Sequence, residues 1–175
     1  AFPGEKVSGK RMYFAAAYYN DKVFFAPHSA DKIAIYDTVN DEIKMIAFDI
    51  NSTLKFDKNM KFADIVVFGE SVFFIGATYP YILKIDAETY RLEYITIDTE
   101  EQFLFRKGGC IMGESFFVPS VISNVVLEFN MKTKQVRLYK IPCEFKGSWS
   151  MCTDGKYFWL IPRSKGTGFI RWDKE

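Results

Sequence analysis

The 175-residue sequence predicts an all-β protein built from repeated four-stranded antiparallel units. A phrase is written twice, as "GESVFF" from Gly69 and as "GESFFV" from Gly113, and the residues around it follow one pattern in four copies. Aromatic residues make up 18% of the chain, with 18 Phe and 10 Tyr, which favours strands over helices. Such an internal repeat decides the architecture before any single motif does.

Each copy begins with a pair of turn residues and continues with an aromatic strand that ends at Pro or Gly. The turn pairs are Asn20-Asp21, Gly69-Glu70, Gly113-Glu114 and Asp154-Gly155, and the strand-ending residues are Pro27, Gly76, Pro119 and Pro162. These strand-ending residues are separated by 49, 43 and 43 residues. An alternating strand then runs into Asp37, Asp86, Asn130 or Asp173. Such residues suit tight corners, and Pro suits a strand end because it has no N–H to donate.

Period-two alternation, as in "KIAIYD", sets the strands in order along the chain. The first unit is expected to hold strands at 11–18, 22–26, 32–36 and 42–48. The second is expected to hold strands at 63–68, 71–75, 81–85 and 91–97. The third is expected to hold strands at 107–112, 115–118, 125–129 and 135–141. The fourth is expected to hold strands at 148–152, 156–161 and 168–172.

Four-stranded antiparallel units at this period are typical of the blades of a β-propeller. We therefore expect a propeller segment over residues 1–175, with blades near 10–48, 62–98, 105–142 and 147–175. The alignment on Pro or Gly makes Phe24, Phe73, Phe116 and Trp159 equivalent, and it predicts that all four are largely buried.

The segments "NDKVFFAP…KIAIYDTVNDEI" and "GESVFFIG…ILKIDAETYRLEYI" resemble kelch-type blades, and Tyr36-Asp37 and Ile85-Asp86 match the "YD" of that pattern. Only Gly76 stands where the kelch double glycine would be, and the Trp of the last strand is missing. The fourth unit, "DGKYFWLIP…GFIRWD", is more similar to blades of virginiamycin B lyase-like propellers. The resemblance implies a propeller and transfers no catalytic residue.

The phase of the repeat suggests a larger ring. Residues 1–3 align with 140–142, the end of a fourth strand, and the last strand of the fourth blade is missing. We expect the remaining propeller blades to lie in a longer chain, with a complete four-bladed ring as the alternative.

Composition argues against several classes of partner and cofactor. The net charge is +1, from 23 basic and 22 acidic residues, so neither nucleic acid nor a membrane surface is expected as a partner. Three cysteines without CxxC spacing and a single His make a local metal site improbable, and no cofactor is expected. Reduced thiols and the lack of an apolar N-terminal stretch favour the cytoplasm, although a mature or excised segment would lack a signal peptide in any case.

The variable loops between the second and third strands are the candidate ligand-binding positions, because specificity is commonly placed on loops of a repeated scaffold. The candidate residues are His28, Tyr79, Arg163 and Lys165. His28 could act as an acid or base, and Arg163 and Lys165 could clamp a carboxylate or phosphate; a bland surface loop is the alternative for each. Tyr79, Tyr81 and Trp149 could stack on sugar rings or pack in the core. The double glycine of "RKGGC" could admit a ligand or relieve crowding.

These features favour a non-catalytic binding or scaffold propeller that recognises a protein or carbohydrate ligand through its loop face. The alternative is a propeller enzyme, a lyase or a glycan-active hydrolase, with catalytic residues partly outside this segment. The catalytic residues of such an enzyme cannot be named from the sequence, because its carboxylates are dispersed and no Ser-His-Asp constellation is present.

Overall fold

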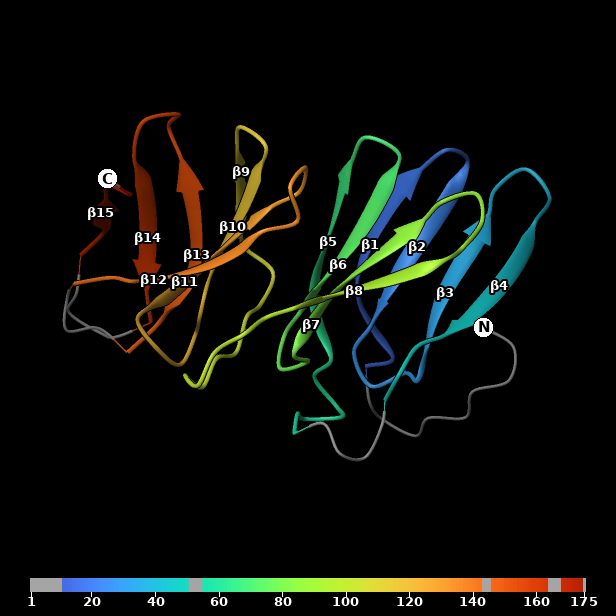
Figure 1. The fold of residues 1–175 in the computed structure, drawn as a ribbon, viewed down its shortest axis with the longest axis horizontal. Coiled ribbons are helices and arrows are strands. Elements are labelled where there is room, and N and C mark those ends of the chain that lie inside the picture. The colour runs from blue at the N-terminus through green and yellow to red at the C-terminus, as the bar shows by residue number, and fades with distance from the viewer. Residues whose placement is uncertain (1–10, 51–54, 143–145, 164–167, 175) are drawn as a thin grey trace. The chain divides into compact units, whose positions relative to one another are not determined.

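The computed structural model describes residues 11–50, 55–142, 146–163 and 168–174. The regular structure in these ranges is antiparallel β-sheet, arranged as four separate sheets (Figure 1). Each sheet is one blade, and its strands pair in the order of the sequence. The chain divides into two compact units, Ala1–Thr96 with blades 1 and 2 and Ile97–Glu175 with blades 3 and 4. The prediction of an all-β fold of four-stranded units is confirmed.

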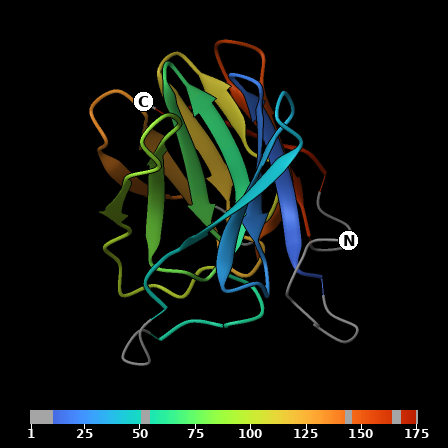
Figure 2. The same cartoon turned by 90° about the vertical axis from the view of Figure 1, so that its right-hand side faces the viewer.

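All fifteen expected strands are present. Blade 1 comprises β1 (Tyr13–Tyr19), β2 (Lys22–Pro27), β3 (Lys32–Asp37) and β4 (Glu42–Ala47). Blade 2 comprises β5 (Phe62–Phe68), β6 (Ser71–Gly76), β7 (Tyr81–Asp86) and β8 (Leu92–Thr96). Blade 3 comprises β9 (Cys110–Met112), β10 (Ser115–Pro119), β11 (Val125–Asn130) and β12 (Val136–Lys140). Blade 4 comprises β13 (Ser148–Thr153), β14 (Phe158–Pro162) and β15 (Ile170–Trp172). The strands twist within each blade, as the steep angle of β4 to β1 shows in Figure 2.

Two-residue turns join the first and second strands of the blades. Asn20 and Asp21 have φ of 47° and 56°, Gly69 has 56° and Gly113 has 61°, the left-handed angles that such turns require. In blade 4 the turn is Gly155-Lys156 rather than the predicted Asp154-Gly155, because the Asp154 N–H donates to the Tyr157 carbonyl across the hairpin. The Asp154 carboxylate accepts the N–H groups of Lys156 and Tyr157.

Counting from these turns corrects the alignment of the aromatic strands. The third residue after the turn is Phe24, Phe73, Phe117 or Trp159, so Phe117 and not Phe116 belongs to the set. The strand pairing agrees, because Ser120 bridges Phe105 as Pro27 pairs with Tyr13. Pro119 thus comes one residue early in blade 3, and an alignment on Pro slips there by one.

The core of each unit lies between its two blades. In the first unit, Phe24 and Ile35 of blade 1 pack in one cluster with Val72 and Phe74 of blade 2. In the second unit, Phe117 of blade 3 lies against Phe158 of blade 4, with ring centroids 4.4 Å apart.

Burial of the predicted aromatic set is confirmed for three of its four residues. Phe24 is 0% exposed, Phe73 is 1% exposed and Phe116 is 4% exposed, and Phe117, the equivalent residue in the turn-based alignment, is 1% exposed. Trp159 is 36% exposed, so the prediction that it is buried is wrong. Phe24 and Phe117 each pack in a cluster with residues of the blade that follows theirs in the chain, and Trp159 lies in neither of these clusters.

Asp and Asn side chains shape the turns between the third and fourth strands of the first three blades. Asp37, Asp86 and Asn130 each accept the backbone N–H groups two and three residues further on. The backbone N–H of Asn40 lowers the pKa of Asp37, and that of Thr89 lowers the pKa of Asp86. Turn chemistry therefore accounts for these residues, as the sequence predicted.

The first strand of blade 3 departs from the prediction. It begins at Cys110 rather than near residue 107, because residues 106–109 oppose only two residues of the partner strand. Gly108 has φ of 131°, and a Cβ on Gly109 would lie 2.3 Å from the Phe116 ring. The double glycine of "RKGGC" thus relieves crowding, which is the structural one of the two roles predicted for it.

Candidate functional site

One backbone hydrogen bond recurs at the loop end of all four blades. The residue that follows the end of the second strand donates its N–H to the carbonyl of a residue near the start of the first strand. The donor and acceptor pairs are His28 to Met12 at 2.7 Å, Ala77 to Lys61 at 2.7 Å, Val121 to Leu104 at 2.9 Å and Arg163 to Gly147 at 2.8 Å. Two candidate residues from the sequence, His28 and Arg163, therefore occupy the same structural position in blades 1 and 4.

A β-bulge also recurs at this end of the first strand. The register skips one residue in blades 1, 2 and 4, namely Phe14, Ala63 and Trp149. A bulge re-aims the side chain of the extra residue and is frequent beside functional sites. It gives each of these blades one side chain that departs from the in-and-out alternation of the strand.

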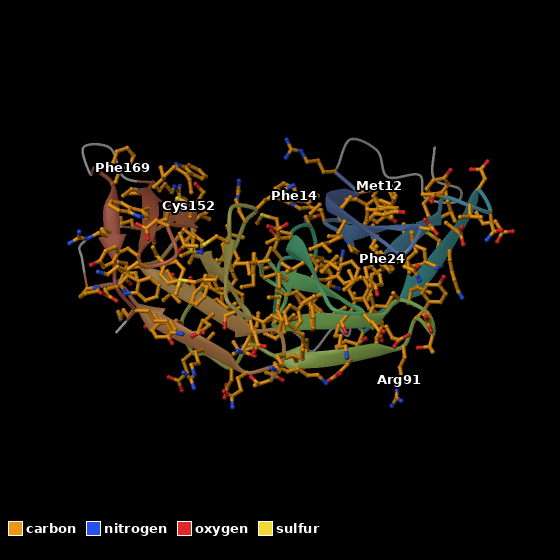
Figure 3. The ribbon with its side chains drawn as sticks, turned by 90° about the horizontal axis from the view of Figure 1, so that it is seen from above. Met12, Phe14, Phe24, Arg91, Cys152 and Phe169 are labelled. Atoms are coloured by element: carbon orange, nitrogen blue, oxygen red, sulfur yellow. The ribbon has the colours of Figure 1, made fainter. Side chains whose placement is uncertain are left out.

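The two recurring features bring a basic and an aromatic side chain together in blades 1 and 4. The ring centroids of His28 and Phe14 are 5.3 Å apart with a tilt of 30°, and the Arg163 guanidinium lies 5.5 Å from the centroid of the Trp149 ring. We call these the aromatic–basic pairs. Phe14 and His28 are half-buried, Trp149 is 49% exposed and Arg163 is exposed. Phe14, a residue of β1, is labelled in Figure 3.

Blades 2 and 3 lack such a pair. The equivalent positions in blade 2 are Ala63 and Ala77, both buried, and blade 3 has the buried Val121, which is opposite Leu104. Loop positions that are equivalent in the scaffold thus differ in chemistry from blade to blade.

Sequence reasoning named His28, Arg163 and Trp149 separately but missed Phe14 and the pairing. A signal was available, because Phe14 precedes His28 by 14 residues and Trp149 precedes Arg163 by 14 residues. The bulge that makes this spacing meaningful cannot be read from the sequence.

The pair in blade 4 is held firmly. Arg163 Nη1 donates to the Val121 carbonyl at 3.1 Å, and the Ser148 N–H donates to the Ser120 carbonyl at 2.9 Å. Gly147 has φ of 102° and presses on blade 3, where a Cβ would lie 2.3 Å from the Val121 carbonyl carbon. The backbone on both sides of Trp149 is therefore fixed against the neighbouring blade.

The sequence also gave no signal for a buried lysine at the start of blade 2. Lys61 is 1% exposed, and its ammonium lies 2.7 Å from the Lys58 carbonyl, 3.0 Å from the Ser29 carbonyl and 3.1 Å from an Asp31 carboxylate oxygen. Its three N–H donors thus match three acceptors. Because all three donors are used within the protein, we infer that Lys61 stabilises the packing of the blade 1 loop against blade 2 and does not bind a ligand.

The remaining candidates from the sequence do not extend the site. Tyr79 is 0% exposed, packs against Phe48, Phe56 and Phe62, and donates its hydroxyl to the Asp49 carbonyl. Burial raises the pKa of Tyr79, and no surface of its ring is left for a ligand, so the ligand-binding role predicted for it is not supported. Lys165 lies outside the described residues.

Features that would point to catalysis are sparse in the described ranges. They contain no group of three or more His, Cys, Asp or Glu side chains that could hold a metal. In a separate respect, no helix in the same ranges is long and apolar enough to cross a membrane. Burial, and secondarily Cys152, raises the pKa of the Cys110 thiol to about 11, which leaves it protonated at neutral pH. Cys152 is exposed, and Cys143 lies outside the described residues.

A shallow hollow lies at the loop end of blade 3. It encloses about 590 Å³ and is lined by Glu100, Glu101, Gln102, Ile122 and Ser123. Lys140 pairs with Glu101 at 3.2 Å, beside the hollow. The walls carry mainly hydrogen-bond acceptors, so the hollow suits a ligand rich in hydroxyl or N–H donors.

Several solved structures are similar in fold to this chain. The structure of virginiamycin B lyase from Staphylococcus aureus matches with a TM-score of 0.64 at 12% identity, over 92% of this chain and 55% of that one. A catalytically inactive variant of that lyase with quinupristin gives a TM-score of 0.67 at 12% identity, over 96% of this chain and 58% of that one. The computationally designed protein Ika4 gives 0.65 at 7% identity, over 99% of this chain and 95% of that one.

These likenesses show a β-propeller fold, as the sequence predicted. No protein-family profile matches the chain, and no curated protein matches it. The chain spans about half the length of the virginiamycin B lyase structures. At identities this low the likeness concerns the fold alone, because one fold carries many functions.

Proposed function

We propose that this chain is a non-catalytic recognition propeller that binds a protein or a carbohydrate through the loop ends of its blades. The observation that carries the proposal is the recurrence of an aromatic–basic pair at equivalent positions of blades 1 and 4. Exposed Trp and Arg are the residue types that contribute most to binding at recognition surfaces. A scaffold that keeps the same backbone hydrogen bond in its four described blades while it varies these two positions is suited to setting specificity.

The chemistry of the described residues supports binding more than catalysis. An acid–base mechanism needs a titrating group with a suitably shifted pKa that faces a second catalytic group. Asp37, Asp86 and Asp154 have lowered pKa values, each caused by hydrogen bonds within its own turn. These carboxylates therefore stay ionised at neutral pH for a structural reason.

A binding survey tests the proposal. The purified protein is screened against an oligosaccharide array and a displayed-peptide library, beside the variants Trp149→Ala and Phe14→Ala. Trp159→Ala is the matched control, since Trp159 is also partly exposed but lies near the turn of the β13–β14 hairpin, at the opposite end from Trp149. We expect the hits to persist in Trp159→Ala and to weaken at least tenfold in one loop-end variant, which is about 1.4 kcal/mol. Hits that persist in both loop-end variants would contradict the proposal.

A propeller lyase is the second candidate function, supported by the fold likeness to virginiamycin B lyase and by the place of His28 at a loop end. Incubation with quinupristin and with the glycans that bind, followed by mass spectrometry, tests it. A product that is lost in His28→Asn would favour the enzyme over the binding module.

A further inference from the structure

The aromatic–basic pair of blade 4 has the form of a site for one particular class of ligand. We propose that Trp149 and Arg163 bind a carbohydrate that carries a carboxylate, such as a uronic or sialic acid residue. The sugar ring stacks on Trp149, and the carboxylate is held by the Arg163 guanidinium. This inference rests on the proposed function and names the ligand class of that same site.

The aromatic partner is exposed and pre-positioned. Trp149 is the extra residue of the bulge in β13 and is 49% exposed, although the residue before it, Ser148, is 0% exposed. Ser148 and Gly147 fix the backbone beside it by their contacts with Ser120 and Val121. A rigid aromatic ring loses little conformational entropy when a ligand stacks on it.

The cationic partner is placed to select charge. Arg163 uses Nη1 on the Val121 carbonyl, which fixes the guanidinium near the indole ring. No other acceptor is found for the guanidinium among the described residues, so its planar fork retains donors that match a carboxylate. The two partners together favour a ligand with an apolar ring face next to an anionic group.

The surroundings distinguish a sugar acid from a polyanion. Gly147 presses on blade 3 where its Cβ would lie 2.8 Å from the Ile122 nitrogen, and Ile122 lines the hollow with Glu100, Glu101 and Gln102. The carboxylates of this wall accept hydrogen bonds from sugar hydroxyls, and they repel a densely charged polyphosphate or sulfated chain more strongly than a ligand with a single carboxylate.

One of two buried hydroxyls points the same way. The Oγ atoms of Ser148 and Ser123 have no hydrogen-bond partner among the described residues. Ser148 is 0% exposed and is out of reach of a ligand, whereas Ser123 lines the hollow. Buried polar groups normally find a partner, so Ser123 marks a place in the hollow where a ligand hydroxyl or a water can bind.

The test uses a panel of oligosaccharides built from uronic acids or ending in sialic acid, each beside its carboxyl-reduced neutral counterpart. Affinity is measured by isothermal titration and by quenching of tryptophan fluorescence. We expect at least one acid to bind at least tenfold more tightly than its neutral counterpart. Arg163→Gln should abolish that preference while weak binding of both forms remains, and Trp149→Ala should remove binding of both forms.

Arg171→Gln is the matched control, because the Arg171 guanidinium also faces an aromatic ring, that of Tyr157 at 4.7 Å, but lies on β15. It should leave the affinity unchanged. Equal binding of acid and neutral forms, or no binding across the panel, would overturn this inference. If the binding survey then finds a peptide whose binding is lost in Trp149→Ala, the proposed recognition function stands and only the ligand class is wrong. If the loop-end variants change the binding of no ligand, both the ligand class and the proposed function are wrong.

Discussion

The ammonium group of Lys61 is buried, yet it lies 3.1 Å from the carboxylate of Asp31, whose side chain is 65% exposed. Lys61 directly precedes β5, and its contacts with Asp31 and the Ser29 carbonyl join the start of blade 2 to the loop of blade 1, while the Lys58 carbonyl accepts its third N–H. A buried cation is tolerated only while its donors are matched.

Replacing Lys61 by Met should lower the free energy of unfolding by about 2–4 kcal/mol, because the partly buried hydrogen bonds to the Ser29 and Lys58 carbonyls and the ion pair with Asp31 are lost. Lys58→Met is the control, since the Lys58 side chain is exposed and should change the value by less than about 0.5 kcal/mol. Urea unfolding followed by fluorescence measures both. Equal values for the two variants would show that the Lys61 interactions contribute nothing net.

A second prediction concerns the ion pair between Glu128 and Lys174, in which Lys174 Nζ lies 2.7 Å from Glu128 Oε1. Burial acts to raise the pKa of Glu128, but hydrogen bonds from Lys174, Tyr139 and Ser115 outweigh it and lower the pKa. Lys174→Met should therefore cost about 1–3 kcal/mol at pH 7, with the lower end reflecting the partial exposure of Lys174.

In that variant burial dominates and the pKa of Glu128 should rise, so part of the lost stability should return as the pH falls and the carboxyl becomes protonated. Denaturant melts at pH 7 and pH 5 provide the measurement. A loss of stability that is the same at both values would contradict this account, and the double variant with Glu128→Gln should lose less than Lys174→Met alone at pH 7.

A third prediction concerns acid stability at the blade 4 hairpin. The backbone N–H of Tyr157 is the main cause that lowers the pKa of Asp154 to about 2, with the Trp159 indole N–H second, at 2.9 Å. The folded pKa lies below the unfolded value of about 3.9, so the contribution of Asp154 is present above that value and is lost as the pH falls towards 2. Asp154→Asn should thus be less stable than the wild type at pH 5, with the difference closing near pH 2.

Fluorescence-monitored melts between pH 5 and pH 2 measure the stability of Asp154→Asn against the wild type. Trp159→Phe, which removes only the indole donor, should show part of the same loss of stability. A difference between Asp154→Asn and wild type that does not change with pH would refute the assignment.

A fourth prediction tests the register of the aromatic strands. Phe117→Ala should lower the free energy of unfolding by about 3–5 kcal/mol, because the ring is 1% exposed and packs on Phe158. Trp159→Ala, at the equivalent but 36% exposed position, should cost about 1 kcal/mol. Thermal melts of both variants measure these losses, and a larger loss for Trp159→Ala would contradict the difference in burial between the two equivalent positions.

A fifth prediction concerns Gly147, whose positive φ and contact with Val121 leave no room for a side chain. Gly147→Ala should destabilise the protein by about 2 kcal/mol or more and should weaken ligand binding at Trp149 as well. Gly168→Ala is the control, since nothing lies within 4 Å of its added Cβ. Circular dichroism melts compare the two, and an unchanged melting temperature for Gly147→Ala would mean that the backbone there is free to relax.

The sequence was sufficient to predict the fold, because turn residues, alternation and strand-ending prolines agreed in each repeat. It failed where one residue matters. Pro119 stands one position early in blade 3, and in a strand a slip of one residue moves every side chain to the opposite face, so Phe116 was taken for Phe117.

The candidate site was predictable only as separate residues. His28, Arg163 and Trp149 carry recognisable chemistry, but Phe14 reads as an ordinary strand aromatic until the bulge re-aims it. Lys61 could not be predicted, since its three acceptors come from segments that only tertiary structure brings together.

Among the residues that the structure describes, every ladder between named strands joins strands that are adjacent in the sequence. A blade can therefore complete its own hydrogen bonds as soon as its residues have left the ribosome, without waiting for a distant segment to be translated. Blade 1 must still hold an apolar face in water until blade 2 arrives to cover Phe24 and Ile35. During translation, the apolar face of the most recently completed blade should therefore be exposed until the next blade has been synthesised. In that interval the nascent chain most needs a chaperone.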